Sequence, residues 1–407
     1  MLKSNRKILR TILLSCGLVA GSLSALTAPA QSAAPSEIPD VLAPPPASSA
    51  PDVPGLTIDN SRANPPLIRY ESVDPLKLPP DKNLGEVLSV AVNSKGDILV
   101  LNHPGSANYG PLYGAATTEL LLFDKQGNFK KEIGRGVYGL GYGHSVRYDK
   151  YDNLWVVDKG TDAVIKFDPQ GKVLMNLGRR DEGYDSAVHI DRPKPSEAVP
   201  RVGWFHGPTD VAWDANDDIY ISDGYTNSRV VKLDKYGTWL KSWGQFGLSG
   251  PHADKNPGKF WNPHSVQVDR SGNVYVADRI NRRIQVFDGD GHFLRFILLN
   301  VPWNKKRPQT LEMYGFSQML PDETLPWALC ITNTTPQYLY AIDHEPGRIY
   351  KMTLEGKIIG MLGESGRQQG QFNWPHGIAC PEENVLFIAD MNNWRVQKLT
   401  LHPEPTK

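Results

Sequence analysis

Short runs of alternating apolar and polar residues recur along the chain, separated by turns rich in Gly, Asp and Asn. One complete unit spans residues 264–297, where "HSVQV", a turn at 269–273, "VYVAD" and "IQVF" are followed by a last run at 292–297. Alternation at period two with turn residues between the runs predicts a four-stranded antiparallel meander. The pattern therefore predicts β-structure along the chain.

The same unit occurs six times. The units open with "VLSVAVNSKGDILVLN", "GHSVRYDKYDNLWVVD", "GPTDVAWDANDDIYISD", "PHSVQVDRSGNVYVAD", "PWALCITNTTPQYLYAID" and "WPHGIACPEENVLFIAD". Six such units predict an all-β, six-bladed β-propeller, here over residues 67–404, in which radial repetition protects the strand edges. The sixth unit ends after its third strand, so we expect the apolar segment Leu67–Tyr70 to supply the missing outer strand and close the ring.

A fixed count within the unit singles out three histidines. The second strand of five units ends in Asp, and that of the first unit in Asn102. We call the residue fourteen positions earlier the register position; in units two, four and six it is occupied by His144, His264 and His376. The odd units have other residues there, with a two-residue insertion in the fifth unit: Leu88, Thr209 and Trp327.

Propeller geometry gives this alternation a chemical meaning. The first strand of each blade is innermost, and alternate blades of six are about 120° apart, so we expect the three imidazoles to converge on the axis. Three imidazoles with a fourth position open are typical of catalytic zinc. The alternative is that each histidine only marks the entry into a strand. Seven other histidines do not occupy the register position, and we expect them in loops or on the surface: His103, His189, His206, His252, His292, His344 and His402.

Two further candidates lie just beyond the strand-ending aspartates. Tyr225 follows Asp223 in "SDGYTNSR", and Arg279 follows Asp278 in "ADRINRR". A phenol beside a cation can act as a general base, and a guanidinium can hold a carboxylate. The alternatives are packing for the tyrosine and a salt bridge for the arginine. The strand-ending aspartates recur in units with and without histidine, so we expect them to accept hydrogen bonds from loop amides.

The ends of the chain and its charge narrow the functional classes. Residues 1–30 have the basic start, apolar run and Ala28-Pro29-Ala30 site of a secretory signal peptide, with a lipoprotein anchor at Cys16 as the alternative. Residues 31–66 are rich in Pro, Ala and Ser, and we expect a disordered leader. Without residues 1–30 the chain has 40 Lys+Arg against 44 Asp+Glu and no basic run, which argues against nucleic-acid binding.

At these residues the sequence resembles an NHL-repeat propeller and, more narrowly, the peptidyl-α-hydroxyglycine α-amidating lyase family. The likeness covers nearly all of residues 84–400 and is densest in "GPTDVAWDANDDIYISDGYTNSRVVKL" and "PHSVQVDRSGNVYVADRINRRIQVF". It implies a zinc site at His144, His264 and His376, a catalytic tyrosine at Tyr225 and a site arginine at Arg279. Three positions depart from the family: Pro104 replaces an arginine, Gly377 replaces the acid of a structural calcium site, and Thr226 replaces a disulfide cysteine.

The resemblance implies an enzyme that cleaves the C–N bond of a peptidyl-α-hydroxyglycine, a carbinolamide. We expect a monomer, exported from the cytoplasm without a transmembrane segment after processing, that acts on a peptide or a small molecule. The alternative is an exported propeller without catalytic activity that binds a peptide, a protein or a cell-envelope component. A lactonase is a third possibility, but such enzymes use carboxylate and Asn ligands, and no acidic set stands at the register positions. Sequence alone leaves open whether Cys330 and Cys380 pair.

Overall fold

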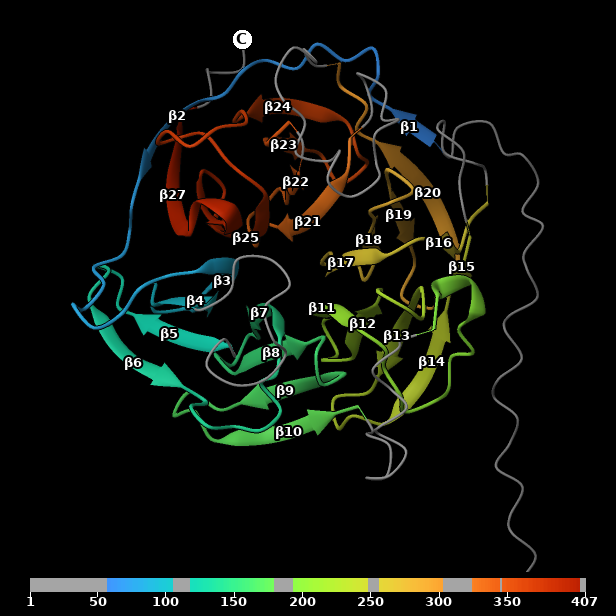
Figure 1. Ribbon diagram of the computed structural model, residues 1–407. Coiled ribbons are helices and arrows are strands. Elements are labelled where there is room, and N and C mark those ends of the chain that lie inside the picture. The colour runs from blue at the N-terminus through green and yellow to red at the C-terminus, as the bar shows by residue number, and fades with distance from the viewer. Residues whose placement is uncertain are drawn as a thin grey trace, which may run out of the picture. The chain divides into compact units, whose positions relative to one another are not determined.

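Six sheets, each built on four antiparallel strands, are arranged around one axis (Figure 1). The computed structural model describes residues 57–104, 118–178, 193–247, 256–302, 324–344 and 346–402. The predicted six-bladed propeller is confirmed, with all six units folded as the sequence pattern requires. Within these ranges, no helix has the length and apolar character needed to cross a bilayer.

Each of the first three blades uses four consecutive strands, from the axis outward. Blade one is formed by β3 (Glu86–Val92), β4 (Ile98–His103), β5 (Glu119–Phe123) and β6 (Phe129–Ile133). Blade two is formed by β7 (Gly143–Tyr148), β8 (Leu154–Asp158), β9 (Ala163–Phe167) and β10 (Val173–Leu177). Blade three is formed by β11 (Pro208–Trp213), β12 (Ile219–Asp223), β13 (Arg229–Leu233) and β14 (Trp239–Trp243).

The other three blades repeat this order, and two of them also use strands from the N-terminal part. Blade four is formed by β17 (Pro263–Val268), β18 (Val274–Asp278), β19 (Arg283–Phe287), β20 (Phe293–Leu298) and, outermost, β1 (Thr57–Asp59). Blade five is formed by β21 (Pro326–Ile331), β22 (Leu339–Asp343), β23 (Arg348–Met352) and β24 (Ile358–Leu362). Blade six is formed by β25 (Pro375–Glu382), β26 (Val385–Asp390), β27 (Arg395–His402) and β2 (Arg69–Val73).

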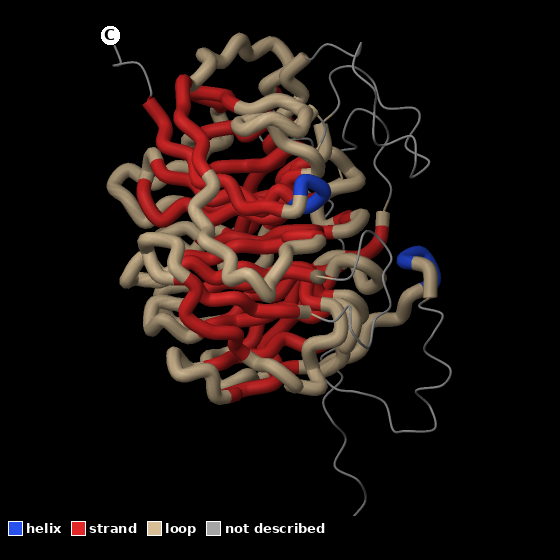
Figure 2. The backbone as a smooth tube through the Cα atoms, turned by 60° about the vertical axis from the view of Figure 1, so that its left-hand side comes forward, coloured by secondary structure: helices blue, strands red, loops and turns tan. Residues whose placement is uncertain are grey.

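The turned view of Figure 2 shows the strands lying between two sets of loops. We call the end where the second strands finish in their aspartates the aspartate rim, and the opposite end the turn rim. Among the described residues, the small elements outside the blades are the parallel pair β15 (Gln245–Phe246) and β16 (Lys259–Phe260) and two 3-10 helices, η2 (Pro195–Glu197) and η4 (Met391–Asn393). On the turn rim, side chains such as Asp149 and Asp269 accept the backbone N–H groups two and four residues ahead, which closes each turn tightly.

The core lies between neighbouring blades. Alternate residues of one strand face opposite neighbours: Leu154 and Val156 of β8 pack toward blade one, while Trp155 and Val157 pack toward blade three. One buried apolar cluster fills each of the six blade interfaces. Since both faces of each second strand are buried, these strands read as continuous apolar runs.

Strand β2 closes the ring as predicted, but it begins at Arg69, two residues later than expected. Strand β2 pairs antiparallel with β27, so that Arg69 lies opposite His402 and Val73 opposite Lys398. Leu67 instead bridges to Met361 of blade five. Blade six is therefore built from both ends of the propeller sequence.

Residues 57–60 fall within the segment predicted as a disordered leader, and here the structure differs. Strand β1 runs parallel to β20, with Thr57 opposite Phe296. The Asn60 side chain is buried and donates hydrogen bonds to the carbonyls of Leu298 (2.9 Å) and Gly356 (3.0 Å). Composition missed this strand because three residues held by two neighbouring blades need little apolar content of their own. The predicted signal peptide, Cys16 and the rest of the leader lie outside the described residues.

A disulfide joins the innermost strands of blades five and six. Cys330 of β21 and Cys380 of β25 are bonded, with their Cα atoms 6.1 Å apart. This bond resolves the pairing that the sequence leaves open.

Candidate metal centre

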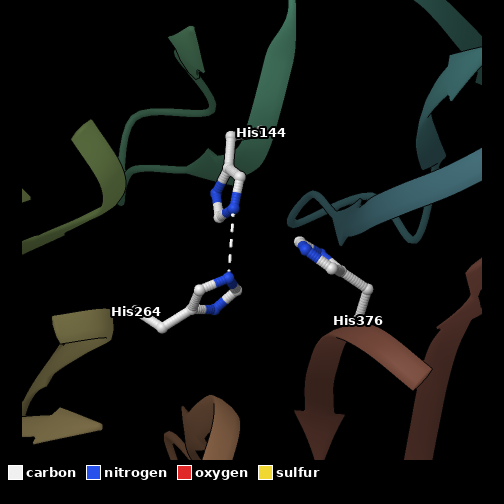
Figure 3. Close-up of side chains that lie close together, drawn as sticks. All are labelled: His144, His264 and His376. Carbon is white, nitrogen blue, oxygen red and sulfur yellow. Dashed lines mark hydrogen bonds between the residues drawn. The ribbon is translucent and has the colours of Figure 1, made fainter. Parts of the chain in front are cut away.

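The three register histidines converge on the axis. His144, His264 and His376 are each the second residue of an innermost strand, and all three are buried. Their possible ligand atoms all lie within 4.8 Å of one another, and Figure 3 shows the rings pointing toward a common point from three blades. In the described part of the chain, this is the one group of three or more His, Cys, Asp or Glu residues that could hold a metal ion.

A bulge in every innermost strand explains this convergence. In blade two, Gly143 pairs with Asp158 and Ser145 pairs with Val157, so His144 is the extra residue. The same shift occurs at the register position of all six blades. A bulged residue is turned away from the regular side-chain alternation. The fixed count of fourteen residues in the sequence is therefore the signature of this bulge.

The odd blades supply the backbone acceptors that orient the rings. Nδ1 of His144 lies 2.7 Å from the Thr209 carbonyl oxygen, Nδ1 of His264 lies 2.8 Å from that of Trp327, and Nδ1 of His376 lies 2.9 Å from that of Leu88. A carbonyl oxygen only accepts, so each Nδ1 carries a proton and donates it. These acceptors are the register residues of blades three, five and one. The ring thus alternates a ligand side chain with a backbone acceptor, which leaves each Nε2 toward the axis.

The electron pairs on Nε2 make a cation the fitting occupant. Nε2 of His144 and Nε2 of His264 lie 3.2 Å apart. When both Nδ1 atoms are protonated, neutral rings place two lone pairs against each other, which is unfavourable unless a cation lies between them. Burial lowers the pKa of His376 to about 3 and holds the pKa values of His144 and His264 well below 6.5, so a proton is a poor candidate. Three neutral imidazoles that share one point fit a divalent transition metal.

Tyr225 and Arg279 lie beside the histidines on the aspartate rim. The Tyr225 hydroxyl is 3.2 Å from Nε2 of His144. Burial alone would raise the pKa of this phenol, but the positive charges of Lys159 and Arg279 nearby outweigh burial and lower the pKa. The Arg279 guanidinium packs over the Trp327 ring at 4.1 Å. The alternative of a salt bridge to a repeat aspartate does not describe Arg279, because Arg283 fills that place beside Asp278 at 2.9 Å.

Lys159 is a site residue that the sequence reasoning missed. It follows Asp158 as Arg279 follows Asp278, so the same register would have found it. Its ammonium lies 4.4 Å from the centre of the Tyr142 ring and 4.5 Å from that of Tyr225. The charge of Lys159 also helps to lower the pKa values of His144 and His376, after the larger effect of burial.

Two histidines expected in loops or on the surface are buried instead. His103 and His344 follow the strand-ending Asn102 and Asp343, and they have relative exposures of 0% and 1%. His103 lies 3.8 Å from the Glu86 carboxylate, and the His344 ring packs between Trp327 and Trp374. Burial lowers the pKa of each. The expectation failed because it tested only the register position and ignored the position after the aspartate. Of the others, His292 and His402 are exposed, His206 is partly buried, and His189 and His252 lie outside the described residues.

The strand-ending aspartates hold the loops that precede the histidines. Asp158 accepts the backbone N–H of Tyr142 at 2.9 Å, and Asp278 accepts that of Trp261 at 2.8 Å. These amides lie two and three residues before the bulged histidines. Burial raises the pKa of Asp158 to about 6, although hydrogen bonds from Thr161 and Tyr142 oppose the shift. The aspartates therefore position the site as acceptors for loop amides, as their recurrence in every kind of unit predicts.

The residues below the histidines do not fit a structural calcium ion. Gly377 offers no side-chain ligand, and Asp210 is the one acidic residue that lines the cavity of about 20 Å³ beneath the three rings. Its carboxylate already accepts hydrogen bonds from Arg147 at 2.8 and 2.6 Å and from Ser265 at 2.6 Å. Calcium needs six to eight oxygen ligands. The Arg147 guanidinium therefore occupies the place beside Asp210 that a calcium ion would need.

Comparison with known proteins shows which proteins this chain is similar to. The model of the NHL repeat matches residues 260–287. Rat peptidylglycine alpha-amidating monooxygenase is 28% identical over 337 residues, which cover 78% of this chain and 30% of the rat protein. A probable peptidyl-alpha-hydroxyglycine alpha-amidating lyase of Caenorhabditis elegans is 23% identical over 353 residues, which cover 79% of this chain and 84% of that protein. The chain resembles the amidating lyases.

The likeness to amidating lyases runs through most of the chain and relates it to an enzyme family with an NHL-type propeller. A gluconolactonase structure from Xanthomonas campestris matches with a TM-score of 0.52 and 11% identity, over 84% of this chain and 96% of that one. At this identity the match shows the propeller fold alone. The chain spans under a third of the rat amidating enzyme's length, so the activity of that whole protein is not carried over.

Proposed function

We propose that this protein is a zinc-dependent lyase that cleaves the C–N bond of a peptidyl-α-hydroxyglycine or a similar carbinolamide, releasing an amide and glyoxylate. The observation that carries the proposal is the convergence of three Nε2 atoms, oriented by carbonyls on their Nδ1 side, beside a tyrosine hydroxyl between two cations. Similarity to proteins named as amidating lyases supports the same reaction class.

His144, His264 and His376 would hold the zinc ion. A ligand set of three histidines leaves one position for substrate and is typical of catalytic rather than structural zinc. When bound, the ion supplies Lewis acidity at the substrate hydroxyl oxygen. The three rings need no movement for this, since their Nδ1 hydrogen bonds already fix their orientation.

Tyr225 is the general base of the proposed reaction. Its lowered pKa favours the phenolate, which accepts the proton of the substrate hydroxyl. As the C–O bond becomes the aldehyde C=O, the C–N bond breaks and its electrons stay on the amide nitrogen. Tyr225 returns the proton to that nitrogen, so the residue ends the cycle as it began. The products are a peptide amide and glyoxylate, with no oxidant or water consumed.

Arg279 orients the substrate carboxylate. The buried Nε of its guanidinium has no hydrogen-bond partner within the described ranges, so it has a donor to offer. A guanidinium holds a carboxylate through two parallel hydrogen bonds, which fixes the reacting carbon relative to Tyr225.

Metal content and glyoxylate release test the proposal. We expect about one zinc per chain by elemental analysis, lost in His264→Ala, because one set of three histidine ligands holds one ion. We expect glyoxylate from α-hydroxyhippurate, lost in Tyr225→Phe with zinc content unchanged. A wild-type protein that binds zinc and releases no glyoxylate would overturn the lyase. A protein without transition metal would favour a propeller that only binds a ligand.

We also propose that the protein is exported. The basic and apolar start of the sequence supports this, and so does the Cys330–Cys380 disulfide, because disulfides persist in oxidising compartments. The processed N-terminus of secreted protein, read by sequencing, tests cleavage after Ala30. A cytoplasmic protein with an intact Met1 would contradict export.

A further inference from the structure

In four of the six blades the residue after the strand-ending aspartate or asparagine is a His, Lys or Arg, and these residues form a second layer of the site on the aspartate-rim side of the three histidines. His103, Lys159, Arg279 and His344 occupy this position in blades one, two, four and five. Blade three has Gly224 there, and Tyr225 follows it. The layer therefore places a phenol in blade three with one basic side chain in the blade on either side, Lys159 and Arg279.

Lys159 is held in place by aromatic rings. Its ammonium is 4.4 Å from the centre of the Tyr142 ring and 4.5 Å from that of Tyr225, and its backbone N–H donates to the Tyr142 carbonyl at 3.1 Å. Ammonium groups within about 6 Å of a ring centre are attracted to the ring face. Arg279 is held in the same manner, 4.1 Å from Trp327 and 5.8 Å from Tyr225. The two cations are thus fixed on either side of one phenol.

Both cations lie beside the Tyr225 phenol, Lys159 at 4.5 Å and Arg279 at 5.8 Å from the centre of its ring. The Tyr225 hydroxyl lies 3.2 Å from Nε2 of His144. A ligand oxygen bound next to the histidines therefore comes within reach of an ammonium and a guanidinium together. Side chains that carry permanent charge in a partly buried site favour a ligand of opposite charge.

We propose that Lys159 is a second anion-binding residue of this site and that, with Arg279, it selects substrates that carry a carboxylate next to the reacting carbon. The inference rests on the proposed function for its substrate class, and on the contacts of Lys159 for its residue. Lys159 contributes charge and one hydrogen-bond donor from blade two, opposite the donors of Arg279 from blade four. A neutral ester or amide at the same carbon loses both interactions.

Binding of hippurate, an unreactive acid, to the zinc-loaded protein tests this by calorimetry, with methyl hippurate as the neutral probe. We expect Lys159→Met to weaken hippurate binding about tenfold or more, the usual effect of losing a charged hydrogen bond. Methyl hippurate should bind weakly and equally to both proteins. Lys159→Arg should restore hippurate binding, and Lys172→Met, an exposed lysine of the same blade, should leave it unchanged. Zinc content should stay the same in all variants.

Three results would overturn the inference: hippurate binding unchanged in Lys159→Met, an equal loss for hippurate and its ester, or no hippurate binding by the wild-type protein. An equal loss would mean that Lys159 only packs against the rings. The test does not depend on turnover. Charge-dependent hippurate binding without glyoxylate release would reject the lyase and keep the role of Lys159, whereas glyoxylate release with unchanged binding in Lys159→Met would do the reverse.

Discussion

At the scale of single residues, the site depends on which ring nitrogen carries the proton. Each register histidine donates from Nδ1 to a backbone carbonyl, and burial disfavours a second proton on Nε2. A buried neutral imidazole that must become charged is a source of acid sensitivity. The three histidines are therefore ready to bind a metal ion, and without one they should make the protein sensitive to pH.

Metal-free protein should lose stability as the pH falls below about 6.5. The folded-state pKa of His376 is lowered from 6.5 to about 3, so between these two pH values the unfolded chain binds a proton that the folded chain does not. Each histidine that stays neutral should lower the free energy of unfolding by about 1.4 kcal/mol per pH unit in this window. Urea unfolding from pH 7.5 to 4.5 measures the slope. His376→Gln should reduce it, and the exposed control His292→Gln should not; equal slopes in all three proteins would contradict the prediction.

The position of the three histidines could be predicted from the sequence, but their partners could not. The count from the aspartate works because every blade carries the same bulge, so sequence distance translates into a level along the axis. Lys159, His103 and His344 were missed although they share the register of Arg279. The carbonyl acceptors of Leu88, Thr209 and Trp327 depend on distances between blades, which no spacing within one unit reports.

At the scale of elements, hydrogen bonds link the innermost strands beneath the candidate metal centre. Arg147 of β7 binds Asp210 of β11 and the Leu329 carbonyl of β21 at 3.1 Å, and Ser265 of β17 also donates to Asp210. Four of the six innermost strands thus share one buried network. Such a network is costly to leave half satisfied.

Removal of Arg147 should destabilise the fold and removal of calcium should not. Arg147→Met leaves Asp210, which is 2% exposed, without its cation, and we expect a loss of about 3–5 kcal/mol in the free energy of unfolding. The double variant Arg147→Met, Asp210→Leu should lose less free energy of unfolding than the single variant.

Thermal unfolding with and without EGTA should give the same Tm. A calcium-dependent Tm would show that this network does not replace an ion.

The disulfide should stabilise the packing of blade five against blade six. It closes a loop with a sequence separation of 50, and the chain-entropy model gives about 4 kcal/mol for a loop of that length. We expect Cys330→Ser with Cys380→Ser to lower the free energy of unfolding by about 2–4 kcal/mol, measured in urea, with metal binding retained. Loss of metal binding in the double variant, under conditions in which it remains folded, would indicate that the disulfide also positions His376.

At the scale of the whole molecule, the ring is closed by strands from both ends of the chain. The sequence predicts this closure because the sixth unit lacks a strand and an apolar segment precedes the first unit. It does not predict β1, whose three residues are held by contacts with blade four and by Asn60. Long apolar alternation is visible in a sequence, but a short strand fixed by tertiary hydrogen bonds is not.

Stepwise truncation should separate these two strands. A chain that begins at residue 66 lacks β1 but keeps β2, so it is the reference for the removal of β2 alone. A chain that begins at residue 74 lacks β2, which exposes the edge of β27 and leaves blade six with three strands. We expect its Tm to fall by about 5–10 °C, as a loss of a few kcal/mol implies, with aggregates on size-exclusion chromatography. Equal Tm values for both chains would contradict the closure by β2.

Around the axis, the even blades supply the histidine side chains and the odd blades supply the carbonyl oxygen atoms that orient them. Because the odd blades contribute main-chain oxygen atoms, the identity of Leu88, Thr209 or Trp327 does not decide whether the rings point inward. Leu88 can therefore be replaced by another apolar residue without loss of its carbonyl acceptor for His376, whereas the Trp327 ring also packs 4.9 Å from the His264 ring and Thr209 also donates to the Pro263 carbonyl at 2.8 Å. A new specificity could therefore be engineered on this scaffold by changing residues of the odd blades while the three histidines of the even blades are kept.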